Sequence, residues 1–241
     1  MLKKLSLLIT FLMIISIGNY YSYAQTMATT ADGDGADATI YNDEASGPGT
    51  RAGNEPSLEV RYWEEVRFRA AFLRFDLNKI DVQADSAMLG FNPDYAGKMH
   101  AESREFTIFG LADETQDDWS EANLCYSNAP AFESAADGNY KINDKLKELT
   151  KITVYSDSTG KYLYSKPDTS FDNFINNNSN QYVTFVIIRT YTTEDDYYMI
   201  NSKEAGEMVA PRLVFKSENG QPILPNFAPT ITLNSPADGV S

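Results

Sequence analysis

Short runs of alternating apolar and polar residues constrain the fold of this 241-residue chain most strongly. The runs are rich in β-branched and aromatic residues and are separated by stretches rich in turn-forming residues, which is typical of strands joined by turns. Nine such runs follow one another along the chain: DATIYND, SLEVRYW, RFRAAFLRFDL, DSAMLGFN, EFTIFGLA, KITVYS, YVTFVIIRT, YYMIN and PRLVFK. Helical periodicity is almost absent. The sequence therefore predicts an all-β fold, a β-sandwich of the jelly-roll type.

Two segments depart from this pattern. The apolar residues of INDKLKELT have helical spacing, so Asn143 to Leu149 is predicted to form either a short helical turn or a loop that caps one end of the sandwich. The stretch from Ser156 to Asn180 is rich in Asn, Ser and Tyr. We interpret it as a long loop insertion that contains a weak hairpin around Thr159 and Gly160.

The first 24 residues have the three parts of a secretory signal peptide. Lys3 and Lys4 provide the positive start, Leu5 to Ile17 the apolar run, and Ser22 to Ala24 a cleavage site with small residues. The apolar run is shorter than the roughly 20 residues that a membrane-spanning helix needs. We therefore expect a cleaved signal peptide at 1–24, a secreted or cell-surface protein, and no membrane span.

The rest of the chain is expected to divide into three parts. Residues 25–35 are small, polar and glycine-rich, and are predicted to form a flexible lead-in. Residues 36–218 hold the strand-like runs and form the sandwich. Residues 219–241 contain APTITLNSPADGVS, which is typical of a linker followed by the first strand of a truncated immunoglobulin-like domain. The chain is therefore expected to be one module of a longer protein.

Composition excludes several classes of function. The chain carries 34 acidic and 20 basic residues, a net charge of −14, so it lacks the basic field of a non-specific nucleic-acid binder. Its single cysteine, Cys125, cannot form an internal disulfide. Its single histidine, His100, removes most metal triads and Ser-His-Asp arrangements, since each needs at least one well-placed imidazole.

Four motifs occur in a fixed order: FLRFDLNKI, DSAMLGF, DDWSEANLCYSNAP and INSKEAGEMVAPRLVF. Together they resemble the DNRLRE-type domain, which is grouped with carbohydrate-binding module family 96, over roughly Asp37 to Phe215. The resemblance implies a β-jelly-roll module that binds polysaccharide, often algal and acidic, and that is attached to lyases, hydrolases or adhesive proteins. Leu124 to Tyr126 stand where the family usually has a second tryptophan, so Cys125 or Tyr126 is expected to fill a core position.

The framework roles of these motifs can also be predicted. In FLRFDL, period-two alternation places Leu73, Phe75 and Leu77 in the core. Arg74 and Asp76 lie on the other face, where they are able to pair. Trp119 is interpreted as a structural plug beneath a loop rather than a platform for a sugar ring. A charge pair between Glu204 and Arg212 would tie the terminal strands together, and Lys203 is the more exposed candidate for ligand contact.

Acidic clusters in the sequence are candidate sites for a bound calcium ion. Asp32, Asp34 and Asp37 alternate with glycine or alanine and form the preferred candidate metal site, since oxygen-ligand loops need such turns. The bidentate glutamate of an EF-hand is missing, so the match is partial. Two other clusters compete for this role, one of Asp113, Glu114, Asp117 and Asp118, the other of Asp195 and Asp196.

The stretch LEVRYWEEVRFRAAFLRFDL contains half of the chain's arginines. Its apolar phase switches near Ala70 to Phe72, which predicts a β-bulge or a break between two strands. If Glu64 and Glu65 form a turn, Tyr62 and Trp63 lie at the tip of a hairpin. The candidate ligand residues are Arg61, Tyr62, Trp63, Arg67 and Arg69.

These residues have two interpretations. Guanidinium groups match a carboxylate or sulfate in a bidentate way, and an aromatic ring packs on a sugar face, a combination that suits an anionic polysaccharide. Alternatively, the arginines pair with the chain's many acids. The leading hypothesis is a non-catalytic module that binds an acidic, uronate- or sulfate-bearing polysaccharide. A polysaccharide lyase with tyrosine and arginine chemistry, and a structural stalk or adhesion domain, remain alternatives.

Overall fold

The computed structural model describes residues 27–64, 66–80, 84–94, 99, 101–136, 138–189, 193–195 and 197–215, with the backbone of 217–218 and 221–222. The expected signal peptide, His100, Asp196 and the expected immunoglobulin-like strand in the tail lie outside the described residues. No helix in the described part of the chain has the length and apolar character that a membrane span requires.

The predicted all-β fold is confirmed. The strands are β1 (Met27–Thr29), β2 (Ala36–Asp43), β3 (Arg51–Ala52), β4 (Ser57–Trp63), β5 (Arg67–Asp76), β6 (Met88–Phe91), β7 (Ser103–Leu111), β8 (Phe132–Glu133), β9 (Lys141–Ile142), β10 (Leu146–Tyr155), β11 (Leu163–Tyr164), β12 (Tyr182–Arg189), β13 (Tyr198–Asn201), β14 (Arg212–Val214), β15 (Ser217–Glu218) and β16 (Gln221–Pro222). The helices are α2 (Thr169–Asn176) and four 3₁₀ turns, η1 (Glu114–Gln116), η2 (Glu121–Asn123), η3 (Tyr126–Asn128) and η4 (Lys203–Ala205).

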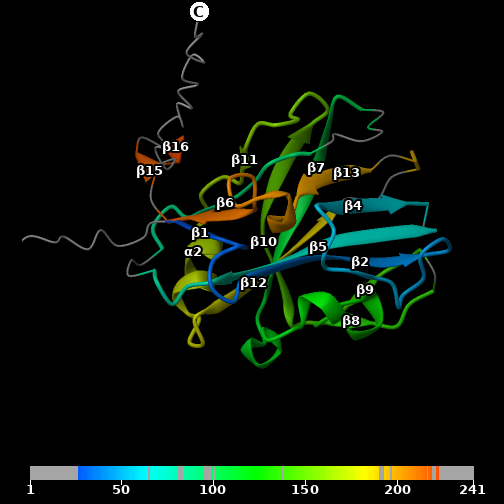
Figure 1. Cartoon of the computed structure of the whole chain (residues 1–241), viewed down its shortest axis with the longest axis horizontal. Coiled ribbons are helices and arrows are strands. Elements are labelled where there is room, and N and C mark those ends of the chain that lie inside the picture. Colours follow the sequence, from blue (N-terminus) through cyan, green and yellow to red (C-terminus); the bar gives the residue numbers. More distant parts are fainter. Residues whose placement is uncertain are drawn as a thin grey trace, which may run out of the picture.

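Antiparallel pairing builds two main sheets (Figure 1). The larger sheet has the strand order β10-β7-β12-β5-β2-β3, and β4 pairs with both β5 and β13. The smaller sheet has the order β1-β14-β6-β11. Two short ribbons, β8 with β9 and β15 with β16, and an isolated bridge between Pro93 and Ile200 complete the pairing in the described residues.

Strand β5 carries apolar residues on both faces, because both faces of the larger sheet are covered. Its register against β2 runs without a shift from Arg67 to Arg74, so the predicted bulge or break near Ala70 is wrong. Phe68 and Phe72 belong to one buried cluster, and Leu73 belongs to the other. The switch of apolar phase therefore marks a strand with two cores, one on each side.

Different elements cover the two faces. The first core includes Leu89 of β6 and Phe171 of α2, so the smaller sheet and the helix pack on this side. The second core includes Trp119, Leu124 and Tyr126. These residues come from the segment between β7 and β8, which contains η1, η2 and η3. This segment lies against β2, because η2 and η3 both contact that strand.

The helix lies in a different place from the predicted one. Leu146 to Tyr155 form β10, so the predicted helical turn over Asn143 to Leu149 is wrong, and the alternative, a loop, holds only for Asn143 to Lys145, which form a turn before the strand. The register against β7 shifts between Glu148 and Thr150, which leaves Leu149 as an extra residue. Leu146 and Leu149 are three residues apart and point to opposite faces, as in any strand, whereas the bulge brings Leu149 and Ile152 to the same core. These three-residue spacings resemble those of a helix.

The stretch from Ser156 to Asn180, predicted to be a loop with a weak hairpin, contains α2 and β11. The Asp168 side chain accepts a hydrogen bond from the Ser170 amide and caps the helix. Strand β11 pairs with β6 instead of forming a hairpin about Gly160. Residues Met27–Thr29 of the expected flexible lead-in form β1, which pairs with β14 and extends the smaller sheet.

Candidate functional site

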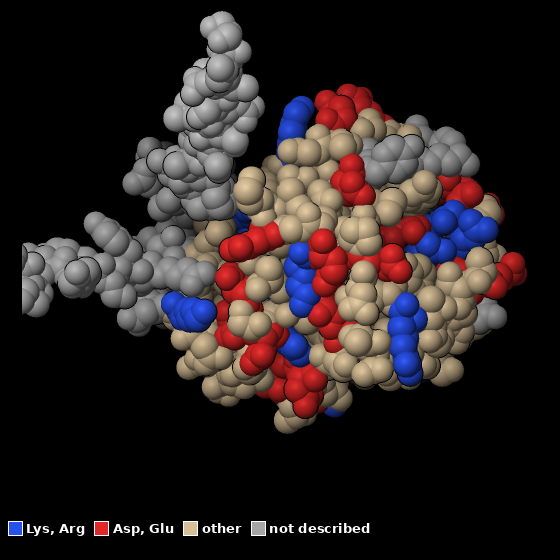
Figure 2. Space-filling model, viewed as in Figure 1, with Lys and Arg blue, Asp and Glu red and all other residues tan. Residues whose placement is uncertain are grey.

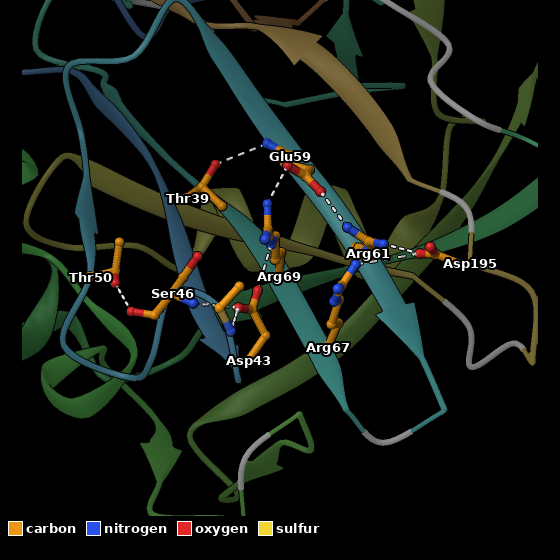
Figure 3. A network of polar contacts seen from close by, with 10 residues as sticks. Thr39, Asp43, Ser46, Thr50, Glu59, Arg61, Arg67, Arg69 and Asp195 are labelled. Atoms are coloured by element: carbon orange, nitrogen blue, oxygen red, sulfur yellow. Dashed lines mark hydrogen bonds and ion pairs between the residues drawn. The ribbon is translucent and has the colours of Figure 1, made fainter.

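The β4–β5 hairpin brings the predicted ligand residues together and divides them between its two faces. Strand β4 ends at Trp63 and β5 begins at Arg67, and the Val66 amide donates to the Trp63 carbonyl at 3.0 Å; Glu65, half of the predicted turn, lies outside the described residues. Arg61 lies opposite Arg69, and Trp63 lies opposite Arg67, so these four side chains share one face. Figure 3 shows Arg61, Arg67 and Arg69 close together with Asp43, Glu59 and Asp195 around them.

Tyr62 points the other way. It lies opposite Phe68, and its ring meets the rings of Phe68 and Tyr140 edge-on, with centroids 5.8 and 5.2 Å away. Its hydroxyl donates to Oδ1 of Asn139 at 2.9 Å. Tyr62 therefore belongs to the second core and lies on the opposite face from the arginines.

Arg69 is held between two carboxylates. Its Nε lies 2.8 Å from Asp43 Oδ2, and its Nη1 lies 2.5 Å from Glu59 Oε2. The guanidinium also lies 4.6 Å from the ring centroid of Tyr41. Burial alone would lower the pKa of Arg69, but Glu59 and Asp43 outweigh burial and raise that pKa. Arg69 is a permanently charged part of the framework.

Arg61 lies in a similar environment one strand away. It is buried, its Nη1 is 3.6 Å from Glu59 Oε1, and its Nη2 donates to Asp195. Its guanidinium lies 5.9 Å from the ring of Trp63 and 5.5 Å from that of Tyr197. Burial lowers the pKa of Arg61. Arg61 thus contributes a buried positive charge, and its guanidinium donors are not exposed to a ligand.

Arg67 and Trp63 form the accessible part of the face. The Arg67 side chain is 34% exposed, and its guanidinium lies 5.2 Å from the Trp63 ring centroid. The indole Nε1 donates to the carbonyl of Thr193 at 3.1 Å, which orients the ring. Asp195 Oδ1 accepts from Arg61 and lies 3.8 Å from Arg67 Nη1, so one carboxylate oxygen sits between two guanidinium groups.

Trp119 fills the second core, as the plug interpretation expects. It is 7% exposed, and its Nε1 donates to Thr184 Oγ1 at 3.1 Å. Arg74 does not form the predicted pair with Asp76 but donates to the carbonyls of Asp117 and Trp119, each at 2.8 Å. It also lies 5.1 Å from the Trp119 ring. Arg74 thus fastens the covering segment onto β5.

Comparison with known protein families decides the identity of this domain. Residues 29–217 match the model of carbohydrate-binding module family 96. The chain belongs to carbohydrate-binding module family 96. A comparison with curated proteins finds no match. Cys125 and Tyr126 are both buried, so both fill the core region where the family's second tryptophan was expected.

Beside the arginine face, the family 96 module has a cavity of about 340 Å³. Tyr41, Arg51, Glu55, Arg69 and Met199 are among its lining residues. Arg51 is exposed, and the cavity therefore extends the charged face of β4 and β5 toward β3. Figure 2 shows acidic and basic side chains interspersed over the face in view, with acidic ones more numerous.

A larger hollow of about 710 Å³ lies along β10 and β11, and the sequence analysis missed it. Tyr155, Tyr164, Lys151 and Lys166 line it, and Tyr155 is 45% exposed. The alternation in KITVYS was the available signal, since it places Tyr155 and Lys151 on one face of a strand. No pattern in the sequence predicts that β11 pairs with β6, and this pairing is what brings Tyr164 to the hollow.

The predicted metal loop does not gather its three carboxylates. Asp32 accepts from the amide and hydroxyl of Thr29 at 2.7 and 2.9 Å, and thereby stabilises its own turn. Asp34 Oδ2 accepts from the Tyr182 hydroxyl at 3.1 Å. Asp37 is buried, and it is the only one of the three in the acidic group found among the described residues. Burial raises the pKa of Asp37 to about 7.

The predicted charge pair between Glu204 and Arg212 is not formed. The Arg212 guanidinium lies 3.6 Å from the ring centroid of Tyr162, and its Nη2 donates to the Met208 carbonyl at 2.9 Å. Glu204 joins Asp37 and Glu121 instead. Lys203 pairs with Glu121, with Nζ 2.6 Å from Oε2, so it is a framework residue rather than an open ligand contact.

Proposed function

We propose that this family 96 module holds a secreted or cell-surface protein on an acidic polysaccharide that bears uronate or sulfate groups. The observation that carries the proposal is the cluster of Arg67, Trp63 and Asp195. There a carboxylate lies between two arginines beside a partly exposed indole ring. The secretory signal and the linker expected from the sequence support export and neighbouring modules.

Asp195 occupies the position that a ligand anion would take. A uronate or sulfate group that replaces it would accept hydrogen bonds from the Arg67 guanidinium. The buried charge of Arg61 would attract the same group. The Trp63 ring offers apolar surface to the C–H side of a pyranose. Because Asp195 neutralises the arginines, the ligand must displace it, and we expect an affinity near the micromolar range for one site.

The pKa values of two tyrosines that adjoin arginines argue against the lyase alternative. A tyrosinate base requires a lowered pKa. Burial raises the pKa of Tyr41, despite Arg69 beside it, and raises the pKa of Tyr162 to about 12, despite Arg212. In both cases burial outweighs the arginine, which is the opposite of activation.

The stalk alternative is favoured by one specific observation. Arg61 and Arg69 are paired with acids of the same chain, so their charge serves the fold first. If Arg67 also served only to pair with acids of the chain, the hairpin face would offer a ligand no arginine donor. The binding module and the stalk therefore differ only in whether Arg67 and Trp63 contact a ligand.

A glycan panel separates the three functions. The purified chain is run through native gels that contain a polyuronate, a sulfated galactan or a neutral glucan, and each mixture is also monitored for unsaturated products that absorb in the ultraviolet. Retardation by an acidic glycan without product supports the proposal. Product formation supports the lyase, and equal mobility in every gel supports the stalk.

A further inference from the structure

Three carboxylates from distant parts of the chain meet at the end of the larger sheet. Asp37 lies on β2, Glu121 begins η2, and Glu204 lies in η4. One oxygen of each lies within 4.8 Å of the others. Glu121 and Glu204 belong to the DDWSEANL and SKEAGE motifs, whose acidic residues have no part in the arginine face.

Asp37 has a carboxylate oxygen without a partner. The residue is 0% exposed, and its Oδ2 accepts from Thr30 Oγ1 at 2.6 Å and from the Lys203 amide at 2.9 Å. Its Oδ1 is buried and has no hydrogen-bond partner among the described residues. A buried carboxylate oxygen without a partner is unfavourable, and a bound cation is one of the few groups that satisfies it.

Lys203 is the basic side chain that pairs with this group among the described residues. The Lys203 ammonium bonds Glu121 Oε2 at 2.6 Å and the Gly35 carbonyl at 3.1 Å. With all three carboxylates ionised, the single ammonium leaves two negative charges, which one divalent cation would balance. Glu121 is already oriented, because its Oε1 accepts from the Asp37 amide at 3.0 Å. Glu204 is exposed and opens the group to solvent.

We propose that Asp37, Glu121 and Glu204 bind a divalent cation that prefers oxygen ligands, with Ca²⁺ as the best match in ligand type. The cation would link β2 to η2 and η4, and so would hold two segments to the main sheet: the one that covers the second core and the one that leads from β13 to β14. Lys203 competes with it for Glu121 and limits the affinity.

Calorimetry on the full chain tests this site. Protein freed of metal with a chelator and then dialysed is titrated with CaCl₂, and its melting temperature is measured with and without the ion. We expect one ion per chain and a rise in melting temperature. Glu204→Gln, at an exposed position, should weaken binding at least tenfold, whereas Glu207→Gln, an equal loss of charge in the same segment, should leave it unchanged.

Lys203→Ala gives an effect of opposite sign. Removal of the competing ammonium should tighten Ca²⁺ binding, although the variant loses the ion pair with Glu121. Absence of binding in both the parent and Lys203→Ala would overturn the proposal, as would equal binding by the Glu204→Gln and parent chains. These measurements use no glycan, so their outcome is independent of the polysaccharide proposal.

Discussion

At the scale of single residues, the arginines of one hairpin have different environments. Arg69 and Arg61 are enclosed by acids from β2, β4 and the segment before β13, whereas Arg67 remains partly open. The sequence identified the group of arginines correctly. It offered no means of assigning their partners, because Asp43 and Asp195 are distant in the chain and meet the arginines only after the sheet has formed.

This difference predicts unequal effects of truncation on stability. Arg69→Ala leaves Asp43 without its cation and leaves Glu59 with Arg61 alone, and removal of one partner from a buried pair costs about 3–5 kcal/mol. Arg67→Ala removes a partly exposed arginine and should cost less than about 1 kcal/mol. Urea unfolding of both variants measures the two values. Equal losses would show that Arg67 is also framework.

Asp117 predicts a pH dependence of stability. Burial raises its pKa from 3.8 to about 6, so the folded chain binds more protons than the unfolded chain between these values. Its contribution therefore becomes unfavourable as pH rises through this window, by up to about 3 kcal/mol at pH 7. Asp117→Asn should be more stable than the parent at pH 7 and equally stable near pH 3. A difference in unfolding free energy that did not vary with pH would contradict this.

At the scale of elements, the sequence predicted strands well but misjudged two phase changes. The phase switch in β5 comes from burial on both faces, and the spacing from Leu146 to Ile152 comes from burial on both faces of β10 together with a bulge at Leu149. Both resemble other patterns in a single sequence, because period-two alternation assumes one buried face and an unbroken register. The helix α2 was missed because its eight residues include only three large apolar side chains, in the order TSFDNFIN.

Helix α2 is predicted to be an integral part of the first core. Phe171 is fully buried and stacks on Phe185, with ring centroids 4.9 Å apart. Phe171→Ala should destabilise the fold by about 3–5 kcal/mol, as expected for a buried aromatic truncation. Asp168→Ala removes only the N-terminal cap and should cost about 1 kcal/mol. Chemical unfolding distinguishes them, and a small effect of Phe171→Ala would mean that α2 is peripheral.

At the scale of the whole molecule, the fold class and the family could be predicted because motif order and strand content are properties of the entire chain. The site could be predicted only in part. Arg67 and Trp63 were named, but Tyr62 was placed with them, although it lies on the other face. The hollow along β10 and β11 depends on tertiary pairing that local patterns do not contain.

The net charge of −14 makes binding to an acidic glycan dependent on one local cluster. Added salt screens the general repulsion between chain and glycan, but it also weakens the arginine contacts. Because the contacts are short-range and the arginines already have acidic partners, we expect affinity to change by less than tenfold between 50 and 300 mM NaCl. Calorimetric titrations with a polyuronate at several salt concentrations measure this. A steep loss of affinity would indicate an extended basic surface instead.

The most direct test of the proposed site is the affinity of matched variants for a polyuronate or a sulfated galactan, measured by gel retardation and calorimetry. Arg67→Ala and Trp63→Ala should each lower affinity at least tenfold while the fold persists. Lys161→Ala, an equal loss of charge at an exposed turn, should have no effect. Unchanged affinity in the first two variants, with a loss in Tyr155→Ala or Lys166→Ala, would contradict this account and place the ligand in the hollow along β10 and β11.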